Sequence, residues 1–203
     1  NDFGSFIYAV HGEYIADFGC NQEFLEFSLD AFEVCTKRFS MEFALRPFLK
    51  NFPDQTFLYV KKWAKSDNYH VRRLACEGIR PNLPWGGKVN IGIPKILSIL
   101  QALHTDHTQY VLRSVANNLN DISKIDSEVV IQTLSSWKQE GKQEKKNILF
   151  LITHALRSQI KSGNPKALQL LGYYMPDIKI NDYNIYSPKV NLGQCLEFSF
   201  DIT

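Results

Sequence analysis

The stretch HVRRLACEGIRPNLPWG, residues 70–86, combines ordered charge with the apolar spacing of a helix. Arg73, Glu77 and Arg80 follow one another at intervals of four and three residues, so they share one helical face, and Pro81 ends the run. Arginines spaced in this way can hold phosphate groups bidentately. The glutamate between them can instead complete a ladder of ion pairs, each worth about 0.3–0.5 kcal/mol. These residues alone leave both interpretations open.

The charges of the chain are unevenly distributed. The net charge is only +2, but residues 1–36 carry seven acidic and no Lys or Arg side chains, a net charge of −7. Residues 61–95 carry eight Lys or Arg against two acidic side chains, a net charge of +6. Such a basic block is expected at a site for a polyanion, whereas a solvated helical face is the simpler alternative.

The sequence argues against a metal site and a membrane span. The four cysteines are far apart without a CxxC motif, and His104 and His107 have no cysteine near them. We expect reduced thiols in a cytoplasmic protein, at Cys20, Cys35, Cys76 and Cys195. No stretch approaches the roughly 18 uninterrupted apolar residues that a membrane span needs.

Apolar spacing is helical nearly throughout, up to about Tyr174. Turn signals separate the helical runs, at Asn51-Phe52-Pro53-Asp54, Ser66-Asp67-Asn68, Trp85-Gly86-Gly87, Asp126-Ser127 and Gly163-Asn164-Pro165. These breaks recur often enough to make paired antiparallel helices the natural unit. The sequence therefore predicts a mainly α protein.

The helix pairs themselves repeat. The pattern Lys37-Arg38, Glu42, Arg46-Pro47 is echoed by Arg72-Arg73, Glu77, Arg80-Pro81. A third unit begins near Val111 and a fourth near Ile148. Repeats of this length with two helices each indicate a HEAT-like α-solenoid, whose stacked pairs curve around a concave groove.

Three successive repeats carry polar side chains opposite their apolar stripes on a helical wheel. These residues are Arg73, Glu77 and Arg80, then Arg113, Asn117, Asn120 and Lys124, then His154, Arg157 and Lys161. Stacking the repeats would join them into a continuous polar track, which favours a bound ligand over a merely solvated face.

The tail of the chain changes character. Leu196, Phe198, Phe200 and Ile202 alternate with polar residues, as in a half-buried strand. Further strands are expected around Ile178 with Ile180 and around Val190 with Leu192. We therefore divide the chain into a helical domain, residues 1–174, and a C-terminal β segment, residues 175–203.

Four stretches carry a family resemblance. They are FGCNQEFLEFSLDAFEVCTKRFSMEFALRPFL, NYHVRRLACEGIRPNLPWG, QYVLRSVANNLNDISK and THALRSQIKSGNPKALQLLG, in this order. Together they resemble the AlkC branch of the AlkC/AlkD DNA alkylation repair glycosylases, over roughly residues 13–172. Four long motifs in register make the resemblance highly specific.

This resemblance implies a HEAT-like fold that wraps alkylated double-stranded DNA with its basic concave face. It implies monofunctional excision of cationic alkylated bases, chiefly 3-methyladenine, without full base flipping. It also implies that the tail begins an immunoglobulin-like domain and that further helices precede a chain starting at Asn1-Asp2 without methionine, so we expect a fragment. We expect a monomer in the bacterial cytoplasm, associated with the nucleoid.

The same resemblance assigns roles to residues of this chain. Glu42, Glu77 and Asp121 fall at acidic positions of the site, with Asp121 in NNLNDISK matching the catalytic aspartate. DNA contacts are expected from the polar track and its flanks, namely Arg38, Arg72, Arg73, Arg80, Trp85, Arg113, Asn117, Asn120, Lys124, His154, Arg157 and Lys161. One departure is Asn82, where many relatives have arginine.

Carboxylates inside a basic groove suit this chemistry. A cationic purine already has a weak glycosidic bond, so no metal, cofactor or lysine nucleophile is required. A carboxylate beside the sugar stabilises the developing oxocarbenium ion and orients water. Each residue also has a structural alternative: Glu42 can pair with Arg38 or Arg46, Asp121 can be solvated before Lys124, and Trp85 can anchor a loop, a role that we expect for Trp63 and Trp137.

Two other functions stay open from the sequence. The first is a non-catalytic DNA-binding HEAT protein, which would bind duplex DNA but release no base. The second is a protein-interaction scaffold, the common use of α-solenoids, which would bind no DNA. The retention of carboxylates within arginine-rich motifs favours the enzyme.

Overall fold

The computed structural model describes residues 2–203, which form two compact units. One unit ends at Gly172 and is helical, and the other, Tyr173–Thr203, contains two strands. The division lies two residues before the position that the sequence suggested. The identity of the second unit as the start of an immunoglobulin-like domain stays a prediction.

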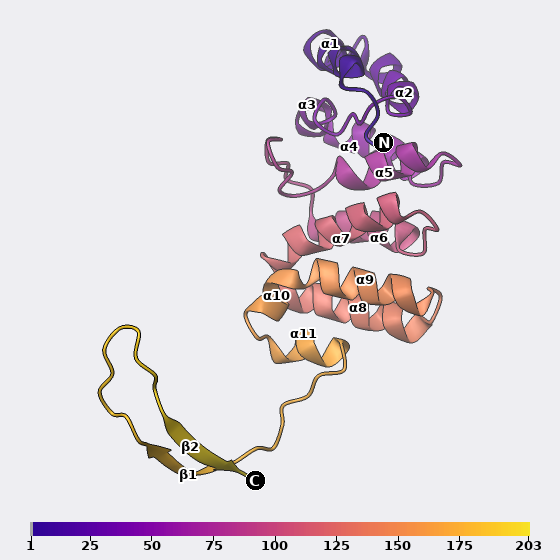
Figure 1. Cartoon of the computed structure of the whole chain (residues 1–203). Coiled ribbons are helices and arrows are strands. Elements are labelled where there is room, and N and C mark those ends of the chain that lie inside the picture. The colour runs from indigo at the N-terminus through magenta and orange to yellow at the C-terminus, as the bar shows by residue number, and fades with distance from the viewer. Residues whose placement is uncertain (1) are drawn as a thin grey trace. The chain divides into compact units, whose positions relative to one another are not determined.

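The helical unit is a stack of short helices (Figure 1). In order these are the 3-10 turn η1 (Phe6–Tyr8) and helices α1 (Ala9–Gly19), α2 (Leu25–Cys35), α3 (Arg46–Asn51), α4 (Pro53–Trp63), α5 (Tyr69–Glu77), α6 (Ile93–Leu103), α7 (Gln109–Ser123), α8 (Ser127–Glu140), α9 (Lys145–Ala155), α10 (Arg157–Lys161) and α11 (Pro165–Leu170). Helix α5 packs against α4, α6 and α7, while α7 packs against α6, α8 and α9. Helices α5, α7 and α9 thus form one row, which confirms the predicted mainly α class built from helix pairs.

The predicted turn signals lie between helices, and several of them cap a helix. The side chain of Asn68 accepts a hydrogen bond from the backbone N–H of His70 at the start of α5. Asp126 does the same for Val129 at the start of α8. Such caps satisfy backbone donors that have no partner inside the helix.

One helix boundary was not predicted. The fourth repeat does not continue from Ile148 to Lys161 as one helix, because it breaks at Leu156 between α9 and α10. Leu156 is fully buried, so the apolar pattern runs through the break without interruption. Spacing therefore gives no sign of this boundary.

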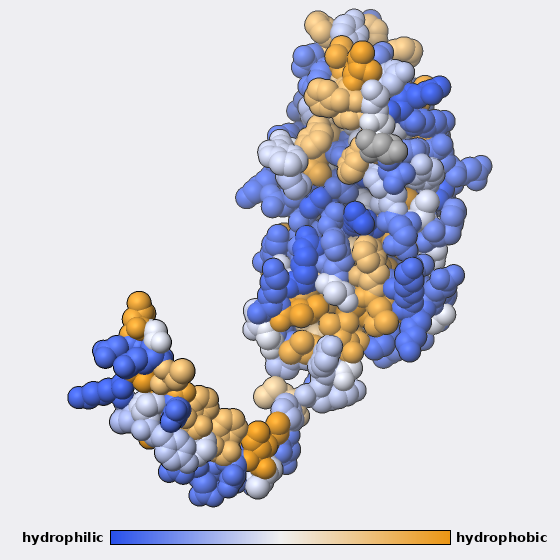
Figure 2. Space-filling model, viewed as in Figure 1, coloured by the Kyte–Doolittle hydropathy of each residue, from blue (hydrophilic) through white to orange (hydrophobic). Residues whose placement is uncertain are grey.

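The core follows the helix stack from α2 to α11. Trp63 and Trp137 are completely enclosed in it, as expected for packing residues. At the N-terminal end of the helical unit, Phe6, Val10 and Phe27 are largely exposed on η1, α1 and α2, where apolar side chains gather on the surface (Figure 2). These exposed side chains form an apolar surface at the end of the helical unit that contains η1, α1 and α2.

The second unit is a two-stranded antiparallel ribbon. Strand β1 (Ile180–Ile185) pairs with β2 (Phe198–Ile202), with an irregularity between Asn181 and Asn184. The strand expected around Val190 and Leu192 does not form, and this segment connects the two strands instead. Within residues 2–203 no helix is long and apolar enough to cross a bilayer.

Candidate functional site

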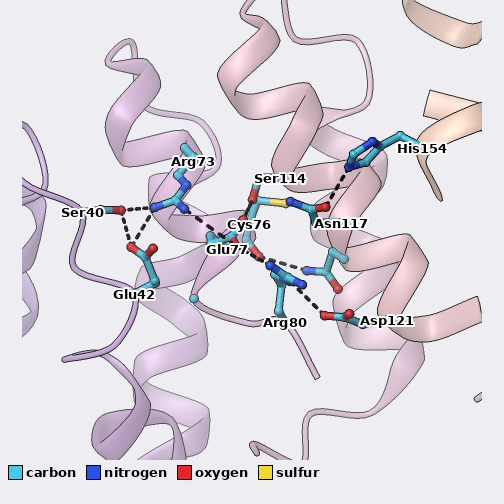
Figure 3. A network of polar contacts seen from close by, with 12 residues as sticks. Ser40, Glu42, Arg73, Cys76, Glu77, Arg80, Ser114, Asn117, Asp121 and His154 are labelled. Carbon is cyan, nitrogen blue, oxygen red and sulfur yellow. Dashed lines mark hydrogen bonds and ion pairs between the residues drawn. The ribbon is translucent and has the colours of Figure 1, made fainter. Parts of the chain in front are cut away.

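Five charged side chains from three parts of the sequence form one chain of ion pairs (Figure 3). Glu42 Oε2 lies 2.7 Å from Arg73 Nη1, and Arg73 Nη2 lies 3.7 Å from Glu77 Oε1. Arg80 Nη1 lies 2.6 Å from the same Glu77 oxygen, and Arg80 Nε lies 2.9 Å from Asp121 Oδ2. Positive and negative charges therefore alternate from Glu42 to Asp121.

Local spacing and tertiary packing each supply part of this arrangement. Arg73 and Glu77 lie on α5 and Arg80 just beyond it, so the two inner contacts follow from helical geometry. The outer contacts join Arg73 on α5 to Glu42, which precedes α3, and Arg80 after α5 to Asp121 on α7. All five residues are at most 6% exposed, although the wheel placed the α5 members opposite the core.

The arginines remain charged in this buried setting. Burial by itself would lower the pKa of a guanidinium group. The carboxylates of Glu77 and Glu42 outweigh burial at Arg73, and those of Asp121 and Glu77 outweigh it at Arg80, so both pKa values lie above the ordinary arginine value. Three carboxylates and two guanidinium groups give the chain a net charge of −1.

Glu77 is the centre of the ion-pair chain, where it holds both arginines. Its Oε1 accepts from Arg80 and faces Arg73, while its Oε2 accepts from Ser114 on α7. Both oxygens therefore have a partner inside the protein, and Glu77 also lines the cleft that Glu42 lines. These contacts bear out the ion pairs that the spacing of α5 indicates, and a catalytic part for Glu77 stays a prediction.

Asp121 and Glu42 each retain an oxygen without a hydrogen-bond partner among residues 2–203. Arg80 donates only to Oδ2 of Asp121, and Arg73 only to Oε2 of Glu42, which also accepts from Ser40. The free carboxylate oxygens, Oδ1 and Oε1, are thus available to a ligand. Among the acidic residues of the ion-pair chain, these two are the candidates for chemistry.

The two candidates line neighbouring hollows rather than one. Glu42 lines a cleft of about 230 Å³, together with Trp85 and Arg113. Asp121 lines a cavity of about 630 Å³, together with Lys124. Arg80 lines the first hollow and bonds Asp121 in the second, so it joins them. Within residues 2–203 no group of His, Cys, Asp or Glu side chains is arranged to hold a metal ion.

Trp85 projects from a tight turn at the edge of the cleft. The N–H of Gly86 donates to the carbonyl of Leu83 at 3.0 Å, with Pro84 second in the turn and Trp85 third at φ 59°. This is the pattern of a type II turn, whose third position normally holds glycine. Trp85 is also 99% exposed, so the sequence's alternative of a packed loop anchor is wrong.

Replacing Trp85 with asparagine is therefore expected to stabilise the protein. A bulky side chain in the left-handed region is strained, and asparagine tolerates that region well. Because the exposed ring contributes almost no burial, Trp85→Asn should raise the free energy of unfolding by about 1 kcal/mol. Urea denaturation measures this change, with Trp85→Phe as the control that keeps the strain. A loss of stability in Trp85→Asn would mean that the ring packs on the protein.

Seven other residues of the predicted polar track can still meet a ligand: five basic side chains that reach the surface, and the pair His154 and Asn117. Arg38, Arg113, Lys124 and Lys161 are exposed and Arg157 is partly exposed, so their charges can meet a ligand. A hydrogen bond of 2.9 Å joins His154 Nε2 to Asn117 Oδ1, across α9 and α7. These residues remain candidates for contact with a polyanion.

Arg72 and Asn120 are corrections to the predicted track. The guanidinium group of Arg72 bonds both oxygens of Asp106 and two backbone carbonyls before α5, so it ties one repeat to the next. The amide of Asn120 donates to the carbonyl of Ala155 at 2.8 Å and is 1% exposed. Both groups are used inside the protein, in contacts that hold neighbouring repeats together.

Further residues shape the site, although the sequence pattern does not single them out. The ring of Tyr110 lies 5.0 Å from the Arg73 guanidinium group, a cation–π contact that supports the ion-pair chain. The hydroxyl group of Ser40 donates to Glu42, and that of Ser114 donates to Glu77. The side chain of Arg46 donates to backbone carbonyls of the loop after α5 and so supports that loop. Of these, only the Arg46-Pro47 echo of Arg80-Pro81 left a signal in the sequence.

His154 should make stability depend on pH. Burial, followed by the nearby charges of Arg157, Arg113 and Arg80, lowers its pKa. As the pH falls through about 6.5, the unfolded state binds a proton before the folded state does, so stability decreases until the folded pKa is reached. Urea denaturation at pH 7.5 and 5.5 should show a smaller difference for His154→Gln than for the parent.

The comparison between parent and variant is necessary because other histidines act in the same direction. Burial also lowers the pKa values of His70 and His104. Their contribution is common to both proteins and cancels in the difference. An equal pH dependence in the parent and in His154→Gln would contradict the assignment.

Known proteins resemble this chain along most of its length. Residues 36–159 match a family model described as DNA alkylation repair enzyme. The chain is 38% identical over 181 residues to "Uncharacterized protein YhaZ" of Bacillus subtilis (strain 168), covering 87% of this chain and 50% of that protein. It is similar in structure to Pseudomonas fluorescens alkylpurine DNA glycosylase AlkC bound to DNA containing an abasic site analog, with a TM-score of 0.80 and 35% identity over 98% of this chain and 54% of that one. The chain thus spans about half the length of these relatives.

Proposed function

The chain belongs to the DNA alkylation repair enzyme family, and on that premise we propose that it is a DNA glycosylase of base excision repair. Its substrate is duplex DNA containing a cationic alkylated purine such as 3-methyladenine, and it hydrolyses the N-glycosidic bond. The similar Pseudomonas structure, an alkylpurine DNA glycosylase on DNA, supports this choice of reaction and partner. In a bacterium such an enzyme would work in the cytoplasm, on the nucleoid.

The observation that carries the proposal is a buried Asp121 with one free carboxylate oxygen. Arg80 holds Oδ2 at 2.9 Å, which fixes the carboxylate while Oδ1 stays available in the cavity. A cationic purine needs no protonation to leave, so the barrier lies mainly in the positive charge that develops on the sugar. A preorganised carboxylate at that point stabilises the charge and can orient the attacking water.

The second carboxylate, Glu42, suits a supporting position. It lines the neighbouring cleft with Trp85, whose exposed ring can stack on a base or a sugar. In this proposal Glu77 keeps Arg73 and Arg80 in place rather than acting on the substrate. The exposed cations Arg113 and Lys124 bind the phosphates, which gives affinity and register without reading the sequence.

Base release from methylated duplex DNA tests the proposal. The protein is incubated with DNA treated with a methylating agent, and free 3-methyladenine and 7-methylguanine are separated and quantified. We expect release of 3-methyladenine and an abasic product whose strand stays intact until it is treated with alkali. Strand cleavage by the protein itself would exclude the monofunctional mechanism.

A non-catalytic DNA-binding protein is the second candidate, because the ion-pair chain alone would also stabilise a binding surface. It predicts duplex binding that weakens steeply as salt increases, with no base released at any salt concentration. Measuring binding and release on the same DNA separates the two functions. Absence of both would indicate a scaffold for other proteins.

A further inference from the structure

A single buried side chain, that of Arg46, closes the neck of the loop between α5 and α6. Its Nη1 donates to the carbonyls of Gly78 at 2.9 Å and Arg80 at 2.8 Å, at the beginning of the loop. Its Nε donates to the carbonyl of Gly87 at 2.8 Å, and Nη2 donates to the same oxygen. Arg46 therefore holds together two points of the backbone that are separated by the tip of the loop.

Arg46 makes these contacts at an energetic cost. It is the first residue of α3 and is 3% exposed, yet no ion pair within residues 2–203 involves it. Burial, together with the nearby Arg80 charge and against the attraction of Asp121, lowers its pKa to about 10. A buried cation without a carboxylate partner is unfavourable unless its hydrogen bonds are needed. The planar fork of donors is thus the property of Arg46 that the fold uses.

The loop that Arg46 closes is compact in its own right. Leu83 is buried beneath it, and a Cβ atom on Gly86 would lie 2.8 Å from the Leu83 side chain. Pro81 and Pro84 restrict the backbone further. This arrangement, with its two ends close together and packed by its own side chain, is that of a small Ω-loop.

The tip of the loop carries Trp85, which other side chains hardly support. Because the ring is 99% exposed, its position depends on the backbone of the turn. The base of the same loop carries Arg80, which links Glu77 to Asp121. The placement of both groups therefore depends on how firmly the neck is held.

We propose that Arg46 is a positioning residue, which presents Trp85 to the nucleic acid and keeps Arg80 on Asp121 in a preformed arrangement. The nature of the ligand rests on the proposed function, but the positioning concerns the free protein. A preformed loop loses little conformational entropy on binding and keeps the reacting groups aligned. If the loop were free, each turnover would have to order it first.

Arg46→Lys is the informative variant, and Arg72→Lys is its matched control. Lysine retains the charge, but from a single nitrogen it cannot reach both sides of the neck as the fork does. Arg72 is likewise buried and likewise bonds two backbone carbonyls, but it lies at the other end of α5 and holds a loop without Trp85. Urea denaturation verifies that both variants are folded.

The first readout requires no DNA. Proteins labelled with 5-fluorotryptophan should give three ¹⁹F resonances, since the chain contains three tryptophans, and Trp85→Phe identifies one of them. We expect the Trp85 resonance to be a single sharp line in the parent and in Arg72→Lys, and to shift or broaden in Arg46→Lys. The lines of Trp63 and Trp137, which are buried, should stay in place. An unchanged Trp85 line in Arg46→Lys would overturn the proposal.

The second readout is base release, which tests whether the arrangement matters. We expect kcat to fall by about 100-fold in Arg46→Lys, as misplacement of reacting groups typically causes, and KM to change much less. Arg72→Lys should stay within about threefold of the parent. A disturbed Trp85 line with unchanged kcat would refute the functional part. If the parent released no base while the Trp85 line responded to Arg46→Lys, the glycosylase would fail and the positioning would stand.

A measurement on the parent protein covers the case in which Arg46→Lys does not fold. The N–H of Gly86 donates to the carbonyl of Leu83, within the exposed loop. With the neck held, this amide should exchange with deuterium far more slowly than amides of the β1–β2 connection. Rapid exchange at Gly86 would show that the loop opens freely and would overturn the proposal.

Discussion

Replacing Asp121 with asparagine is expected to reduce the rate of base release by about 10²–10³-fold, the typical loss when one preorganised electrostatic contact to a transition state is removed. Asparagine keeps the shape of the side chain and can accept a hydrogen bond from Arg80 through its carbonyl oxygen. Asparagine lacks the negative charge that stabilises the positive charge developing on the sugar. Single-turnover release of 3-methyladenine, with enzyme in excess, measures this chemical step directly.

The matched control for Asp121→Asn is Asp106→Asn. Asp106 is also a buried carboxylate paired with an arginine of the preceding repeat, with a side chain 4% exposed against 3% for Asp121. Asp106 also accepts from Thr108 and uses both of its oxygens, so Asp106→Asn should lose at least as much stability as Asp121→Asn, but Asp106 lies outside both hollows that form the site. Base release at a temperature where both are folded should fall only in Asp121→Asn. Equal losses in the two variants would mean that Asp121 acts through stability alone.

Glu42→Gln separates the two candidate carboxylates in the same assay. If Asp121 acts on the sugar and Glu42 supports it, Glu42→Gln should lose less activity than Asp121→Asn. The reverse order would move the reacting position from the cavity of Asp121 to the cleft beneath Trp85. Either result shows which of the two free carboxylate oxygens, Asp121 Oδ1 or Glu42 Oε1, acts on the substrate.

The sequence could predict the parts of the site that depend on local geometry. The spacing of Arg73, Glu77 and Arg80 gave the inner contacts of the ion-pair chain, because residues three and four apart are neighbours on any helix. The contacts of Arg73 with Glu42 and of Arg80 with Asp121 depend on how neighbouring repeats pack. A wheel describes one helix and contains no information on that packing.

The errors in the predicted track have the same origin. Asn120 falls in the polar sector of its helix, yet α9 and α10 pack against α7 and cover it. Arg72 is one residue, or 100°, away from Arg73 on the wheel, and only the family motif placed it at the DNA. Trp85 shows the opposite case, since the sequence predicts its turn but not whether anything covers the ring.

Removing Arg80 should have the largest effect on stability. Arg80→Met would leave the buried carboxylates of Glu77 and Asp121 without their shared counter-ion. Breaking a buried ion pair from one side typically costs about 3–5 kcal/mol, because the remaining charge is uncompensated. The midpoint of urea denaturation should therefore fall sharply while the slope of the transition stays similar.

The loss should be smaller when Asp121 is already uncharged. In Arg80→Met combined with Asp121→Asn, the buried negative charge next to the vacant position is gone, so the double variant should be more stable than the sum of the single losses predicts. Coupling energies between contacting residues are typically about 0.5–3 kcal/mol. Arg72→Met combined with Asp121→Asn should instead be additive, because Arg72 pairs with Asp106 and shares no partner with Asp121. Additivity in the Arg80 pair would show that the ion-pair chain does not act as one unit, and the electrostatic support proposed for Asp121 would then be withdrawn.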